Sequence, residues 1–308
     1  MSTCTTASRD LDEPLAGTAA TARTWLLIEQ SGPWGAKALT SSHLDPEVGR
    51  ALEAAAEGTG VRVALVRRPG RHADRHGQPR RQVYVAHTAP GDAWLRSATI
   101  TAPEELLALD FAALGAGVHG GFGTPHQGAP LALVCTNGKR DRCCAVLGRP
   151  LAAELALSGE EGVWEVTHLG GHRFSPTLLV LPYGYAYGRS TAAEVKEILQ
   201  AVRTGRVVTE GCRGSSAWDR PGQAAELAVR RAAREDAADA LTVVRTEAVE
   251  GDLPCWEVAL AHVDGRRWQV TVAQGTSAPP RPESCGAALG SPARMDVVEV
   301  REVSAPLG

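Results

Sequence analysis

The sequence has few aromatic residues, no large excess of charge and no long hydrophobic run. Phenylalanine, tryptophan and tyrosine together make up 5% of the 308 residues. The formal net charge is −3, which gives no reason to expect nucleic-acid binding through a global electrostatic field. The longest apolar stretches, such as residues 177–188, are short and interrupted by proline and glycine. We therefore expect no membrane-spanning segment.

The first residues, MSTCTTASRDLDEP, are polar and lack the apolar core of a secretory signal, so a cytoplasmic location is expected. Disulfides are rare in a reducing compartment, so the seven cysteines do not predict a disulfide framework. Clustered cysteines in such a chain indicate metal binding or redox chemistry instead. The scattered cysteines are expected to be plain buried or tail thiols, and these are Cys4, Cys212, Cys255 and Cys285.

The pattern along the chain predicts an α+β protein. The predicted parts are a disordered leader (1–22), an N-terminal α/β region (23–127), a domain with the element order β-α-β-β-β-α (128–206) and a C-terminal region of one helix and antiparallel strands (207–308). The helix that closes the third part is the clearest, because Thr191 and Glu194 form a capping box ahead of an apolar stripe. No internal repeat of solenoid period is evident.

Three of the seven cysteines lie within the ten residues CTNGKRDRCC, from Cys135 to Cys144. Cys135 closes a strand of the buried type, and Cys143 and Cys144 open the next helical stretch. A thiolate near a helix N-terminus and near cationic side chains is stabilised electrostatically. The segment therefore favours anionic sulfur, the form that binds metal.

Two histidines follow in the segment HLGGH, at His168 and His172. The two glycines between them permit a sharp turn that brings the imidazoles together, or a close approach of backbone to a cofactor. Two sulfurs and two imidazoles make a set of four ligands, which selects zinc or an iron–sulfur centre over magnesium or calcium.

The spacing of these residues bears on which metal is bound. Cys135 and Cys144 enclose eight residues, whereas the cysteines of a zinc knuckle usually lie two to four residues apart. Rieske 2Fe–2S centres also use two cysteines and two histidines, but they pair one of each in both motifs. Here both cysteines come first and both histidines later.

These segments resemble the sucrase/ferredoxin-like family, a family of thioredoxin-like 2Fe–2S ferredoxins. The family signature is similar to C-x8-C followed by H-x-G-G-H, and the resemblance is clear over about 130–205 and weaker in 25–35 and 45–52. It implies a thioredoxin-like ferredoxin domain. It also implies that the cluster is held by Cys135, Cys144, His168 and His172. Cys143 is the alternative to its neighbour as second ligand, and the x8 spacing favours Cys144.

The resemblance implies a one-electron carrier whose histidine ligands couple electron transfer to proton transfer. A redox enzyme, a thiol or redox sensor, and a zinc-stabilised binding module are the alternatives. The arginine-rich stretch 67–81 is either a solvated loop or a docking site for a redox partner such as a flavin reductase. No pair of carboxylates suggests glycoside hydrolysis.

Overall fold

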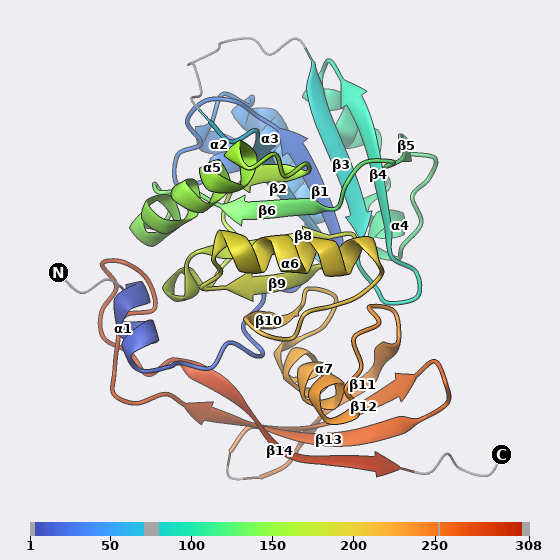
Figure 1. The fold of residues 1–308 in the computed structure, drawn as a ribbon. Coiled ribbons are helices and arrows are strands. Elements are labelled where there is room, and N and C mark those ends of the chain that lie inside the picture. Colours follow the sequence, from blue (N-terminus) through green and yellow to red (C-terminus); the bar gives the residue numbers. More distant parts are fainter. Residues whose placement is uncertain (1–3, 71–79, 252, 304–308) are drawn as a thin grey trace.

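The structure is a computed structural model that describes residues 4–70, 80–251 and 253–303. It contains a ten-stranded mixed sheet with helices packed on it, and a four-stranded antiparallel sheet (Figure 1). The α+β class predicted from the sequence is confirmed. Within the described ranges, no helix combines the length and the apolar character needed to cross a bilayer.

The N-terminal half of the large sheet is built from a β-α-β-β-β series. Its elements are β1 (Thr24–Glu29), α2 (Ala38–Ser41), α3 (Pro46–Ala56), β2 (Val61–Arg67), β3 (Arg81–His87), β4 (Trp94–Ile100), the 3-10 helix η1 (Pro103–Ala108), α4 (Phe111–Gly115) and β5 (Thr124–Pro125). Asp45 begins α3 by accepting a hydrogen bond from the backbone of Glu47, with Pro46 at the first helical position.

The second half has the predicted order β-α-β-β-β-α. Its elements are β6 (Leu131–Cys135), the π-helical turn η2 (Cys144–Gly148), α5 (Arg149–Leu157), β7 (Val163–Val166), the 3-10 turn η3 (His172–Phe174), β8 (Thr177–Leu181), β9 (Tyr185–Gly188), α6 (Ala192–Arg203) and β10 (Cys212–Ser215). The predicted capping box is present, because Thr191 and Glu194 exchange hydrogen bonds at the start of α6.

The two halves share one strand order and meet edge to edge. The sheet runs β10-β9-β8-β6-β7-β2-β1-β3-β4-β5. In each half the first two strands are parallel and the next two add antiparallel, and β2 pairs antiparallel with β7 at the junction. One sheet therefore crosses the boundary that the sequence predicts at 127/128. The repeat is one of topology, which a search for sequence periodicity does not detect.

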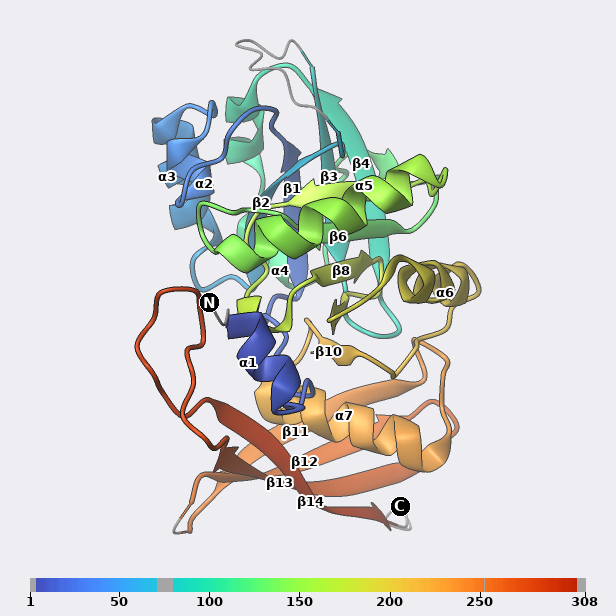
Figure 2. The same ribbon diagram turned by 60° about the vertical axis from the view of Figure 1, so that its left-hand side comes forward.

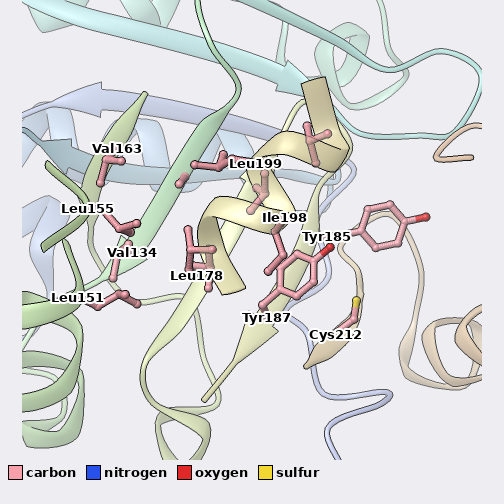
Figure 3. Close-up of a cluster of buried hydrophobic side chains, with 14 of the residues drawn as sticks. Val134, Leu151, Leu155, Val163, Leu178, Tyr185, Tyr187, Ile198, Leu199 and Cys212 are labelled. Carbon is pink, nitrogen blue, oxygen red and sulfur yellow. The ribbon is translucent and has the colours of Figure 1, made fainter. Parts of the chain in front are cut away.

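Helices α5 and α6 cover one face of the second half. Their buried side chains pack over β6, β7, β8 and β9 (Figure 3). Leu155 of α5 and Leu199 of α6 are both fully buried there. Full burial of a leucine side chain contributes about 2 kcal/mol, so this layer holds the strands that lead into the cysteine segment.

The C-terminal unit consists of α7 (Arg220–Ala233) packed on one face of the second sheet. Its strands are β11 (Leu241–Val249), β12 (Cys255–His262), β13 (Arg267–Thr276) and β14 (Ala293–Val303). β10 belongs to the large sheet, so this unit begins later than the predicted boundary at residue 207. A long loop, 277–292, joins β13 to β14.

The described part of the leader differs from the disordered segment predicted over 1–22. Residues Cys4–Asp10 form the helix α1, which lies beside loop 277–292 (Figure 2). Arg189 donates hydrogen bonds to the carbonyls of Ser8 and Glu13. Tertiary contacts therefore order a segment that has no helical periodicity of its own.

Candidate metal centre

The four predicted ligands come together at one edge of the large sheet. Cys135 ends β6 and Cys144 opens η2, while His168 follows β7 and His172 opens η3. β6 and β7 are parallel, so their carboxyl ends lie at the same edge. The sheet topology thus brings together two pairs of residues that the sequence keeps apart.

The side chains of this group contact one another directly. The rings of His168 and His172 are stacked, with centroids 4.2 Å apart and an interplanar angle of 16°. Cys144 Sγ lies 3.5 Å from His172 Nδ1. The Cys135 thiol is close enough to Cys144 and His168 for both to change its proton affinity. Both thiols are almost fully buried, whereas the imidazoles are partly accessible.

The contacts shift the proton affinities of these groups in different directions. The hydrogen bond from Cys144 lowers the pKa of Cys135 well below its usual range, against the effect of burial. The same bond, together with burial, raises the pKa of Cys144. Burial and the neighbouring His168 lower the pKa of His172 to about 4, so its imidazole is neutral at pH 7. A neutral imidazole is the form that binds metal.

A buried arginine supports the turn between the two histidines. Gly170 and Gly171 have φ of +82° and +70°, which favours glycine at both positions. Arg213 is fully buried and donates a hydrogen bond to the Gly170 carbonyl. A Cβ on Gly171 would lie 2.2 Å from the Arg213 guanidinium. Any larger residue at Gly171 would therefore displace this support.

Two cations lie close to the buried thiols. Arg62 donates a 2.9 Å hydrogen bond to the His168 carbonyl. Burial lowers the pKa of Arg213 to about 10, which leaves it charged at neutral pH. Burial also lowers the pKa of Arg62, and a negative charge on Cys135 raises the pKa of both arginines again. Positive charge at these positions compensates negative charge on the sulfurs.

A buried ion-pair network joins the centre to both ends of the described chain. Glu13 accepts hydrogen bonds from Arg173 at 2.8 Å and from Arg281 at 3.0 Å. Arg173 follows His172 in η3, and Arg281 lies in loop 277–292. Arg173 also pairs with Glu283 of that loop. The leader, the histidine turn and the loop are therefore held by one set of charges.

The adjacent cysteines of the segment point to different partners. Cys144 faces the imidazoles, while Cys143 Sγ lies 3.5 Å from Cys4 Sγ and 3.1 Å from Cys285 Sγ. Two groups of donor atoms are thus close enough to hold a metal ion. They are Cys4, Asp141, Cys143 and Cys285 in one group, and Asp141, Cys144 and His172 in the other.

Comparison with known proteins identifies the family. Residues 15–214 match the sequence model of the family described as sucrase/ferredoxin-like. This protein belongs to the sucrase/ferredoxin-like family. The matched residues run from the leader to β10 and include the four candidate ligands. Searches of curated proteins and of solved structures find no match.

Sequence reasoning missed the groups that surround the four candidate ligands. Glu13 and Arg213 are far from them in the sequence, and neither lies in a recognisable motif. Arg67 and Arg81, at the ends of the predicted docking loop, are buried and bind Glu165 and Gln30 respectively. The middle of that loop, 71–79, lies outside the described residues.

Replacing Glu13 by glutamine is expected to lower the free energy of unfolding at pH 7 by about 3 kcal/mol, because two buried guanidinium groups lose their counter-charge. Burial raises the pKa of Glu13, but hydrogen bonds from Arg281 and Arg173 outweigh it and lower that pKa. The stabilisation is therefore present above the ordinary carboxyl pKa and is lost as the pH falls through the lowered value. Urea unfolding from pH 3 to 7 measures the difference.

The control for this prediction is Glu197→Gln, which removes an exposed carboxylate from α6. It should leave the free energy of unfolding nearly unchanged across the range. Equal effects of the two substitutions would contradict the role given to Glu13.

Proposed function

We propose that this protein is a 2Fe–2S redox protein that carries one electron at a time, with Cys135, Cys144, His168 and His172 as the cluster ligands. The observation that carries the proposal is the mutual contact of two thiols and two imidazoles at one sheet edge in a member of the sucrase/ferredoxin-like family. The strand order β9-β8-β6-β7, with its parallel central pair, supports a thioredoxin-like ferredoxin domain.

The donor set fits such a group. Thiolate sulfur and neutral imidazole are the ligands that 2Fe–2S centres take, and buried cations nearby offset the negative charge. Ser175 Oγ lies 3.7 Å from Cys144 Sγ and supplies a further polar contact. All seven cysteines lie in the described ranges and are free.

The bound cluster would supply reversible one-electron chemistry. The chain's own residues determine how far the cluster would be exposed to water. The Cys135 and Cys144 thiols are buried, whereas the His172 side chain is 12% exposed. Its Nδ1 faces Cys144, which leaves Nε2 to take up and release a proton. The same imidazole is therefore placed to transmit both charge and proton.

The first test is metal and sulfide content in protein purified without air. We expect two iron and two acid-labile sulfide per chain, as a 2Fe–2S cluster requires. His172→Ala should lose most of both because it removes one ligand. His119→Ala, on the loop before β5, is the matched control and should retain both. Iron-free protein under these conditions would refute the proposal.

A second test addresses the proton on the imidazoles. Reduction adds negative charge beside His168 and His172, which raises their proton affinity. The reduction potential should therefore fall as pH rises above neutral, with a limiting slope of about 59 mV per pH unit for one proton and one electron. Protein-film voltammetry from pH 6 to 10 measures it. A potential that stays flat across this range would exclude proton coupling at the histidines.

We also propose that a redox partner docks on the basic face beside His168. A cavity of about 300 Å³ reaches that imidazole, and Lys37, Arg62 and Arg140 are among the residues that line it. Lys139, next to Arg140 in the sequence, is also exposed. A partner with an acidic face, such as a flavin reductase, fits this surface, because opposite charges speed association of redox proteins.

The docking proposal predicts a change in rate rather than in cluster content. Arg140→Glu should slow reduction by a donor protein about tenfold at low salt, and added salt should shrink the difference. Arg301→Glu on β14 makes the same charge change on an exposed strand of the other sheet and should leave the rate unchanged. Stopped-flow absorbance measures both. Equal rates for both variants would remove this face as the docking site.

A further inference from the structure

Three cysteines that the sequence leaves unexplained meet beside the candidate cluster site. Cys4 comes from α1, Cys143 from the turn before η2, and Cys285 from loop 277–292. The chain separations are 139, 142 and 281 residues. Cys4 and Cys285 are therefore not the isolated thiols that the sequence suggests. Convergence of three thiols from such distant segments calls for a specific ligand.

The distances between the three sulfurs fit a shared metal ion. Cys143 Sγ lies 3.1 Å from Cys285 Sγ, and Cys4 Sγ lies 3.5 and 3.6 Å from the other two. A disulfide bond is about 2.05 Å long, and an odd group of three thiols cannot pair completely. Thiolates around a tetrahedral zinc ion at about 2.3 Å lie roughly 3.8 Å apart. A small outward shift of each sulfur would admit the ion.

Asp141 positions two of the three thiols. Its Oδ1 accepts a hydrogen bond from the backbone nitrogen of Cys143, and its Oδ2 accepts one from that of Cys285, both at 2.8 Å. The carboxylate is buried, and one of its oxygens lies within 4.8 Å of all three sulfurs. Each carboxylate oxygen keeps a second lone pair, so Asp141 can also offer a fourth ligand atom.

The thiol group can be reached from solvent. A cavity of about 540 Å³, lined in part by Thr5, Arg142 and Cys143, provides an entry path for a metal ion.

We propose that Cys4, Cys143, Cys285 and Asp141 bind one zinc ion, separate from the ligands proposed for the cluster. Cysteine sulfur and aspartate oxygen are both ligands that zinc accepts, and a closed set of four ligands is typical of structural zinc. The ion joins α1 and loop 277–292 to the turn before η2. Thr5, next to Cys4, donates a 3.1 Å hydrogen bond to the His172 carbonyl, so the ion also holds a contact to the histidine turn.

The test is zinc and iron content, measured by mass spectrometry on the full chain purified without air. Wild type should contain about one zinc per chain. The zinc content of Cys285→Ser should be lower by about tenfold or more, while its iron content should be unchanged. Cys255→Ser, a cysteine of β12, is the matched control and should keep both metals. His172→Ala should lose iron and keep zinc, so failure of the cluster proposal and failure of this one give different results.

A second measurement needs no substitution. Cysteine alkylation followed by peptide mapping should show Cys4, Cys143 and Cys285 protected, and a zinc chelator should expose all three together. Unchanged alkylation after zinc removal would overturn the proposal. So would wild-type protein without zinc, a Cys143–Cys285 disulfide in the anaerobic protein, or zinc that is lost in His172→Ala and retained in Cys285→Ser.

Discussion

The carboxylate of Glu13 is the contact on which the candidate centre depends. It lies in the interior between two guanidinium groups, one from the histidine turn and one from loop 277–292. Charges of this kind are tolerated away from water only when each has its partner. The three segments are therefore ordered together, and the imidazole next to Arg173 takes its place as part of that set. Residues at the two ends of the chain shape a site whose donors lie in the middle.

The second half of the chain could be predicted well because its signals are local. The capping box of α6, the strand that ends at Cys135 and the spacing of HLGGH each depend on neighbouring residues. The leader could not be predicted, because α1 is only seven residues long and its contacts are with residues far away in the sequence. The meeting of Cys4 with Cys285 could not be predicted either, since spacing along a chain carries no information about contacts between remote loops. Arg67 and Arg81 look like surface charges in the sequence, and only the packing shows that they are buried.

The joined sheet explains why only one half carries the donors. Both halves have the same strand order, but the strand end that holds Cys135 in the second half corresponds to Glu29 and Gln30 in the first. The Gln30 side chain accepts a hydrogen bond from Arg81, and the Glu29 side chain accepts one from the backbone of Gln82. Because β2 and β7 pair antiparallel through their last residues, Val66 with Val166 and Arg67 with Glu165, the carboxyl ends of the two halves meet at the junction. The first half therefore supports the centre as scaffold, through the buried pair of Arg67 and Glu165 across the junction.

The three-thiol group has a consequence for the order in which the protein is made. Cys4 leaves the ribosome 281 residues before Cys285, whereas Cys135 to His172 emerge together from one continuous segment. A chain is synthesised from its N-terminus, and its parts fold as they appear. The strands that lead to Cys135 and His168 can thus pair on a nascent chain, while the group around Cys143 has to wait until loop 277–292 has been made. Maturation of the protein therefore has a built-in sequence of steps, and a chain truncated before residue 285 would stop between them.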